Sequence, residues 1–429
     1  MSAQACLVAG GLMVLGSGGW SAQPDRASSG SGEPLVPAAE QPAKPWRPTI
    51  EDRLRIQFLS EACLRFLAGC QVTASDGTRL YTPDGKAHYQ ALWTRDFAYM
   101  VESAGDLMPP AQVEACIRYL LRGQRTDGAV PDRVRPDGVP VYAAGSEEHP
   151  LGEPNLDNPQ FLVIAVDGHL RRLEKRRQET LFRQWAAQLD LGLDYLPRSE
   201  AGLIQNDPER PHSPYGFTDT VGKTGELFLE SILYWTACKR MLFWHKEIGQ
   251  RVKAKDYQQR ADAIENAIRV LWDDAAGAFL AATVDCRQVD IWGNAYALYV
   301  GFPLGPRRAR IQQFLAANYE RYVWRGQVRH LLKGEYWQRL LTPVERERYQ
   351  NGAYWATASG WVMLALAERD PKLAHRMFVD LVSDLQTEGI CECVNEGYRQ
   401  LESYVVSAAN PLAAARRLYG FRRPGTHGR

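Results

Sequence analysis

The feature that most constrains this chain is its helical periodicity. From residue 49 onward, apolar residues recur at about 3.6-residue spacing, and strand-like alternation is scarce. Prolines mark several starts, because Pro109 and Pro110 precede the third periodic segment and Asp370-Pro371 opens the eleventh. The pattern predicts about twelve helices, near residues 51–69, 93–107, 111–122, 157–172, 178–196, 224–247, 254–274, 290–300, 306–320, 352–368, 371–387 and 404–418.

Twelve helices without a heptad or a short fixed repeat indicate six helical hairpins closed into a ring. We therefore predict an all-α fold, an (α/α)6 toroid over residues 49–420, with inner helices as the core and a pocket built by loops at one end. Residues 123–156 and 197–223 form long Gly-, Pro- and Asp-rich loops, and such loops are usually functional. The alternative, a helical repeat scaffold for protein binding, does not explain why acidic and aromatic residues collect in these loops.

The N-terminal region indicates export. Residues 6–19 form a short apolar run and a small residue precedes Gln23, although no Lys or Arg comes before the run. We expect residues 1–22 to be a signal peptide and the protein to be periplasmic or secreted. Residues 23–48, rich in Pro, Ser, Gly and Ala, are typical of a disordered linker, and residues 421–429 form a tail.

Charge and cysteine spacing exclude several partners. The formal net charge of +1 gives no electrostatic case for a nucleic acid or a membrane surface. No segment has the length of a transmembrane helix. The eight cysteines show no zinc-site spacing and there is no Gly-rich phosphate loop, so we expect no metal or other cofactor. We interpret the cysteines as buried small residues, with a Cys63–Cys70 disulfide as an option in an exported protein.

The first segment with chemical potential is Trp93-Thr94-Arg95-Asp96, at the start of the second predicted helix. It presents a ring, a guanidinium and a carboxylate together. A sugar hydroxyl can donate to Asp96 and accept from Arg95 in charge-assisted hydrogen bonds. The simpler interpretation is a first-turn aspartate favoured by the helix dipole.

Two further segments place carboxyl groups between helices. Asp219 precedes the helix expected from residue 224 and is flanked by Phe217 and Val221, so burial could raise its pKa as a general acid requires. The simpler interpretation is a helix cap. Glu392 has small, mostly apolar neighbours, which is unusual for a surface glutamate, and Glu396 beside a glycine turn is its rival. Either glutamate could be a solvated loop residue.

These segments resemble, in order and helical context, those of the six-hairpin glycosidases: glucoamylases, trehalases and related α-glucosidases. Residues 92–97 resemble the glucoamylase segment whose Arg-Asp pair holds the terminal sugar. Residues 217–221 resemble the segment of the general acid, which is Glu in glucoamylases and Asp in trehalases. Residues 392–395 with the helix after them resemble the region of the catalytic base. Weaker likeness covers residues 152–159 and 351–355.

The resemblance implies an inverting, exo-acting α-glycosidase for oligosaccharides. Asp219 would be the general acid and Glu392 the general base, with carboxyl oxygens roughly 6.5–9.5 Å apart and a water between them. Asp219 should have a raised pKa, whereas Glu392 should stay ionised near neutral pH. The implied sugar-binding residues are Trp93, Arg95, Asp96, Asp157, Asn158, Tyr354 and Trp355.

Two other function classes stay open at this point. A helical-barrel polysaccharide lyase or epimerase needs Arg, His or Tyr near the pocket, and His88, His149 and His212 fall near the predicted pocket loops. A non-catalytic carbohydrate-binding protein is the second. A nucleophilic hydrolase of the GxSxG type is excluded because the motif is missing. The sugar, the linkage and the oligomeric state are left open by the sequence.

Overall fold

The computed structural model describes residues 46–153 and 155–421. Thirteen α-helices lie in this part of the chain, and twelve of them match the predicted segments, which confirms the all-α expectation. The thirteenth, α10, is a single turn. The helices are α1 (Ile50–Gly69), α2 (Thr94–Ala104), α3 (Pro110–Arg122), α4 (Asn158–Leu170), α5 (Lys175–Tyr195), α6 (Phe228–Glu247), α7 (Arg251–Ala267), α8 (Ile291–Tyr299), α9 (Arg307–Ala317), α10 (Tyr319–Tyr322), α11 (Ser359–Ala367), α12 (Pro371–Glu388) and α13 (Val405–Leu418).

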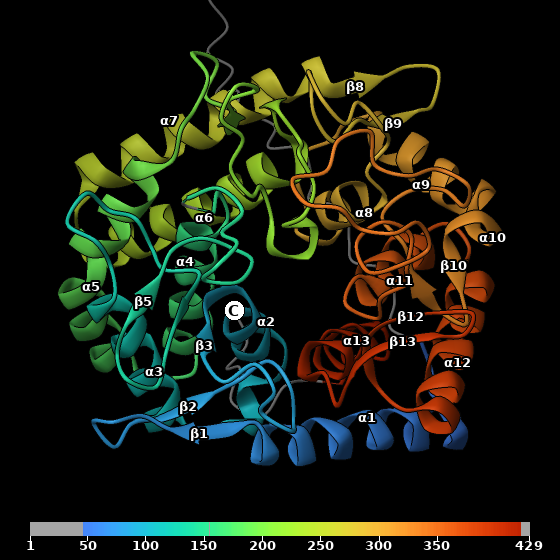
Figure 1. Ribbon diagram of the computed structural model, residues 1–429, viewed down its shortest axis with the longest axis horizontal. Coiled ribbons are helices and arrows are strands. Elements are labelled where there is room, and N and C mark those ends of the chain that lie inside the picture. The colour runs from blue at the N-terminus through green and yellow to red at the C-terminus, as the bar shows by residue number, and fades with distance from the viewer. Residues whose placement is uncertain (1–45, 154, 422–429) are drawn as a thin grey trace, which may run out of the picture. The chain divides into compact units, whose positions relative to one another are not determined.

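Six of these helices form a closed inner ring. In the order α2, α4, α6, α8, α11 and α13, each packs against the next, and α13 packs against α2 to close the ring (Figure 1). The helices α1, α3, α5, α7, α9 and α12 lie outside them. This is the predicted (α/α)6 toroid.

The residue pattern explains which helices lie inside. In α4 every residue except Gly168 is buried, and an unbroken apolar run over residues 161–166 places apolar side chains on all faces of the helix. The outer helix α3 instead buries one stripe that includes Val113, Ile117 and Leu120. Helix starts are also encoded locally: Thr49 and the side chain three residues later form a reciprocal capping box at α1.

Short antiparallel hairpins occupy the connections between helices. Among the strands of the described residues, only β12 and β13 reach five residues. The strands β3, β4 and β5 form a three-stranded patch that pairs Trp93 with Arg133. The strands are β1 (Gln71–Thr73), β2 (Arg79–Tyr81), β3 (Leu92–Trp93), β4 (Arg133–Val134), β5 (Pro140–Val141), β6 (Gln205–Asn206), β7 (Gly225–Glu226), β8 (Trp272–Asp273), β9 (Ala278–Phe279), β10 (Val323–Trp324), β11 (Gln327–Val328), β12 (Cys391–Asn395) and β13 (Tyr398–Glu402).

Two predicted helix starts are wrong. The helix expected from residue 224 begins at Phe228, because the residues before it form β7 and a bridge. The helix expected from residue 352 begins at Ser359. There the backbone of Trp355 pairs with Val328 and that of Tyr354 pairs with Val394, so these residues are extended rather than helical.

Other expectations concern the two ends of the chain, the cysteines and membrane-spanning helices. Residues 1–22, most of the expected linker 23–48 and nearly all of the tail 421–429 lie outside the described residues. At the end of the expected linker, the Trp46 ring packs edge-on against Tyr419, and the backbone N–H of Trp46 donates to the Leu418 carbonyl. The seven cysteines of the described ranges are buried and in no disulfide, so Cys63 and Cys70 do not pair. No helix in the same ranges combines the length and apolar character needed to cross a membrane.

Candidate active site

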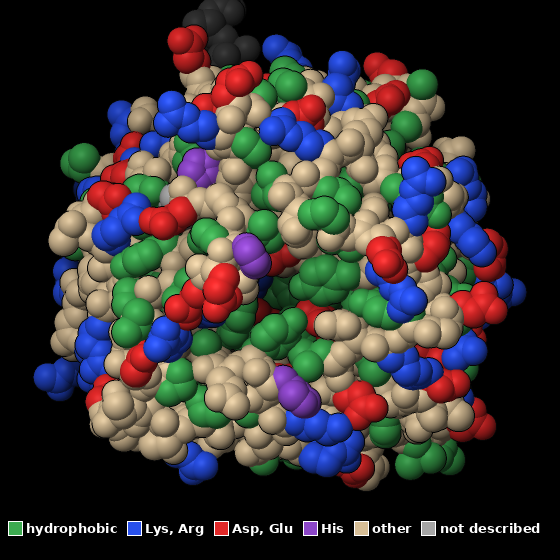
Figure 2. Space-filling model, viewed as in Figure 1, with side chains coloured by type: hydrophobic (Ala, Val, Ile, Leu, Met, Phe, Trp, Pro, Cys, Tyr) green, Lys and Arg blue, Asp and Glu red, His purple; other side chains and the backbone are tan. Residues whose placement is uncertain are grey.

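A cavity of about 470 Å³ opens at the centre of the ring. Figure 2 shows the hollow, with hydrophobic side chains along its walls and acidic side chains within it. Its size falls in the ordinary range of small-ligand sites. The start of α2, both long loops predicted from the sequence, β12 and the segment before α11 all contribute lining residues.

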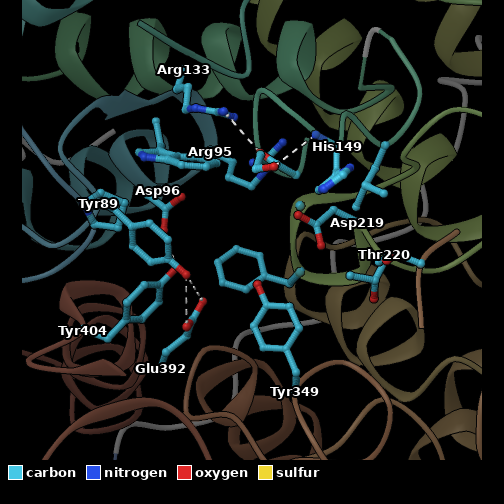
Figure 3. Close-up of a pocket in the computed structure, with 18 residues that line it drawn as sticks. Tyr89, Arg95, Asp96, Arg133, His149, Asp219, Thr220, Tyr349, Glu392 and Tyr404 are labelled. Carbon is cyan, nitrogen blue, oxygen red and sulfur yellow. Dashed lines mark hydrogen bonds between the residues drawn. The ribbon is translucent and has the colours of Figure 1, made fainter. Parts of the chain in front are cut away.

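Five of the predicted site residues line this one cavity. They are Trp93, Arg95, Asp96, Asp219 and Glu392. In Figure 3, Asp219 and Glu392 point into the cavity from different sides, and Arg95 and Asp96 lie along a third side. Both come from the first turn of α2. The fold thus brings together three segments that are far apart in the sequence.

Arg95 is held rigidly by carboxylates behind the cavity wall. Its Nη2 donates to Asp132 Oδ1 at 2.6 Å and to Asn158 Oδ1 at 3.1 Å, and its Nε donates to Asp157 Oδ2 at 3.1 Å. Asp157 and Asn158 are fully buried and do not line the cavity. They lie behind the cavity wall, where they supply the buried guanidinium with a counter-charge and an acceptor.

A glycine makes room for this arginine. A Cβ on Gly216 would lie 1.8 Å from Cδ and Nε of Arg95. The Gly216 N–H also donates to Asp157 Oδ2 at 2.8 Å, which anchors the loop before Asp219 to the arginine cluster. The position therefore needs glycine because of the close approach, and the sequence alone does not reveal that requirement.

Asp96 is buried at the cavity wall and accepts a hydrogen bond from the Tyr404 hydroxyl. Burial raises the pKa of Asp96 to about 6, although Tyr404 and Arg95 both favour the carboxylate. The residue keeps its first-turn position in α2. Its side chain nevertheless faces the cavity, as a sugar-binding carboxylate would.

Asp219 is not a helix cap, because α6 begins only at Phe228. Burial raises the pKa of Asp219 to about 7, against the lowering effects of Arg95 and of a hydrogen bond from Gln350. Gln350 Nε2 donates to Asp219 Oδ1 at 2.7 Å. A carboxyl group that keeps its proton near neutral pH has the property expected of a general acid.

Glu392 lies in β12, with only 3% of its surface exposed. The Tyr89 hydroxyl approaches its two carboxyl oxygens at 3.4 and 3.5 Å. Burial, with the charges of Asp96 and Asp219, raises the pKa of Glu392 well above its usual range. The direction of this shift runs against the expectation that Glu392 stays ionised near neutral pH, because burial and neighbouring carboxyl groups both oppose its ionisation.

Three other predicted residues lie elsewhere. Trp355 is fully buried in aromatic packing with Phe217, and Tyr354 packs against Trp324 and the buried face of β12, so neither ring lines the cavity. Their extended backbone carries them away from it. Glu396, the rival base, is exposed in the β12–β13 turn and borders a separate surface groove.

Several cavity residues were missed by the sequence analysis. Tyr89, Tyr349 and Tyr404 line the cavity, and Gln350 lies directly behind Asp219. Tyr349 has a positive φ of 41°, an unusual backbone conformation that no sequence pattern signalled. The one available signal was the long segment between α10 and α11, which was not recognised as a functional loop.

The histidines named for a lyase are scattered. His149 is exposed and lines the cavity, His88 borders an adjoining hollow, and His212 lines neither. Within residues 46–153 and 155–421, no group of three or more His, Cys, Asp or Glu side chains is arranged to hold a metal ion. Carboxyl and phenol groups line the cavity together with the cationic side chains of Arg95 and Arg133 and the imidazole of His149.

No protein-family model matches the chain, and no curated protein sequence does. Solved structures do match. A rhamnosidase from Klebsiella oxytoca with rhamnose bound has a TM-score of 0.60 and 14% identity over 86% of this chain, and this chain spans 64% of that one. A mannosylglycerate hydrolase from Thermus thermophilus in complex with glucose has a TM-score of 0.59 and 15% identity over 83% of this chain and 99% of that chain.

A glucoamylase from Saccharomycopsis fibuligera is similar over 88% of this chain and 97% of its own, with a TM-score of 0.55 and 12% identity. At such low identity, the likeness concerns the fold and not the sugar that is bound. The chain has the fold of the six-hairpin glycosidases.

Proposed function

We propose that this protein is a glycoside hydrolase that cleaves an α-glycosidic bond at the non-reducing end of an oligosaccharide with inversion. The observation that carries the proposal is the meeting of Asp219 and Glu392 in one cavity beside Arg95 and Asp96. Two facing carboxyl groups are the minimal machinery of glycoside hydrolysis. The three similar structures named above carry glycosidase names, which supports the hydrolase class.

In the proposed reaction, Asp219 gives its proton to the glycosidic oxygen as the carbon–oxygen bond breaks. The bonding electron pair leaves with that oxygen. A water on the opposite face attacks the anomeric carbon with a lone pair and passes one proton to Glu392. The anomeric configuration is thereby inverted, and the two carboxyl groups exchange roles as proton holder. Arg95 and Asp96 hold the hydroxyls of the terminal sugar.

The reactive protonation state has a proton on Asp219 and none on Glu392. Once Asp219 is protonated, one negative neighbour of Glu392 is gone, which makes ionisation of Glu392 easier. The Tyr89 hydroxyl stabilises the Glu392 carboxylate as a donor. Because the two groups titrate together, the pH profile belongs to the pair rather than to either residue.

The carboxyl cluster argues against an anionic substrate. A lyase or epimerase acting on uronic acids must neutralise the substrate carboxylate. The carboxylates of Asp96 and Glu392 would repel that group. The cavity arginines are already paired, Arg95 with Asp132 and Asp157 and Arg133 with Asp132. A neutral sugar avoids this electrostatic cost.

The test is a screen of glycosides and oligosaccharides, with product chromatography and NMR of the first anomer formed. Inverted configuration is expected. Glu392→Gln should nearly abolish turnover, whereas Glu396→Gln should leave it unchanged, because Glu396 is exposed outside the cavity. Retained configuration, or normal turnover of Glu392→Gln, contradicts the proposal.

We also propose export of the protein, on the basis of the apolar run at residues 6–19. Cell fractionation with N-terminal sequencing of the mature protein tests this. A mature chain starting near Gln23 outside the cytoplasm is expected, and an uncleaved cytoplasmic chain contradicts it.

A further inference from the structure

We propose that Gln350 is a positioning residue that fixes which oxygen of Asp219 carries the catalytic proton. The inference rests on the proposed function of Asp219 as general acid. Gln350 is fully buried and does not line the cavity, so it reaches the substrate only through Asp219. It was singled out by no sequence motif.

All four hydrogen-bonding positions of the Gln350 amide are used. Its Oε1 accepts from the Thr220 N–H at 2.9 Å and from the Thr220 hydroxyl at 2.7 Å. Its Nε2 donates to Asp219 Oδ1 at 2.7 Å and to the Gly216 carbonyl at 3.2 Å. A side-chain amide has two donor hydrogens and two acceptor lone pairs, so this set is complete.

This network allows one amide orientation. A flipped amide would set its oxygen against the Asp219 carboxyl and the Gly216 carbonyl, and its NH₂ against the Thr220 N–H. The backbone is also anchored, because Trp337 Nε1 donates to the Gln350 carbonyl at 3.0 Å. An N–H donor is therefore always presented to Oδ1 of Asp219.

The consequence concerns the proton of the acid. A proton on Oδ1 would face the donor N–H of Gln350, so the protonated form of Asp219 carries its proton on Oδ2. Among the described residues, the hydrogen bonds of Asp219 engage Oδ1 alone. Oδ2 is thus left to the ligand. Gln350 aims the acidic O–H at the leaving oxygen without touching it.

The test uses Gln350→Met, which keeps the length of the side chain and removes its hydrogen bonds. Two probes are used: the phenyl glycoside and the glycosyl fluoride of the sugar found in the screen. Fluoride departs without a proton from the acid, whereas phenol departs poorly without one. We expect kcat on the phenyl glycoside to fall about 10- to 100-fold, which is a part of the usual general-acid contribution. On the glycosyl fluoride, kcat should stay within about 2-fold of the wild-type value.

The pH profile gives a second readout. The hydrogen bond from Gln350 lowers the pKa of Asp219, so its removal should move the alkaline limb on the phenyl glycoside to higher pH. The matched control is Gln327→Met. Gln327 is a buried glutamine that donates to the Asp384 carboxylate at 2.8 Å and lies outside the cavity lining. This control should change neither the ratio of kcat on the phenyl glycoside to kcat on the fluoride nor the alkaline limb of the pH profile.

Equal losses on both probes, or no loss on either, overturn the proposal. If Gln350→Met does not fold, the nearly isosteric Gln350→Glu replaces it. The new carboxyl group beside Asp219 should move the alkaline limb upward, since like charges oppose ionisation, and an unmoved limb overturns the proposal. Asp219→Asn separates a failure of this inference from a failure of the proposed function. If it hydrolyses the phenyl glycoside normally, the proposed function itself fails.

Discussion

Replacing the proposed acid should stabilise the folded protein while destroying its activity. Burial raises the pKa of Asp219 from 3.8 to about 7. At about 1.4 kcal/mol for each pKa unit, ionising this carboxyl in the folded protein costs about 4 kcal/mol more than in the unfolded chain. Because the carboxyl borders an open cavity and titrates with Glu392, we expect about 2–4 kcal/mol to be recovered in Asp219→Asn.

The size of this stability gain depends on pH. The folded state holds its proton up to about pH 7, whereas the unfolded carboxyl releases it near 3.8. The folded wild-type protein therefore loses stability as pH rises through this window, and the asparagine variant does not. The stability gain of Asp219→Asn should be absent at pH 4 and full at pH 8. Removing the charge also relieves its repulsion of Glu392.

Urea unfolding of both proteins at pH 4, 6 and 8 measures this effect. Asp190→Asn is a control of opposite sign: burial raises the pKa of Asp190, but hydrogen bonds from His245 and Tyr257 outweigh burial and hold that pKa below 3.8. Asp190→Asn should therefore lose stability above pH 4. A stability gain of Asp219→Asn that does not change with pH would refute the burial argument.

Three further changes test the geometry. Tyr89→Phe removes a hydrogen bond that favours the Glu392 carboxylate, so the acidic limb of the pH–rate profile should move to higher pH; an unmoved limb would contradict the assignment of Glu392 as base. Gly216→Ala should cost about 1–3 kcal/mol in urea unfolding and raise KM, because its Cβ overlaps Arg95; unchanged stability would show that Arg95 can yield. Asp96→Asn should lower kcat/KM about 10- to 100-fold in steady-state assays of a folded protein, and full activity would remove Asp96 from the sugar site.

Much of the site could be predicted because its motifs are local. Trp93, Arg95 and Asp96 are consecutive or nearly so, and any helix starting there presents them together. Asp219 and Glu392 each lie in a segment whose flanking residues already indicated burial. The contact of Asp157 and Asn158 with Arg95 could not be predicted, because the sequence does not show which side chains neutralise a buried arginine.

The sequence by itself determined the helices, since a spacing of about 3.6 residues is a local property that the hydrophobic effect converts into buried faces. Only the tertiary structure decided the chemistry of the cavity. Tyr404 reaches Asp96 across 308 residues and Gln350 reaches Asp219 across 131, contacts made by closure of the ring. Desolvation by that closure, and not residue identity, raises the pKa values of the three carboxyl groups.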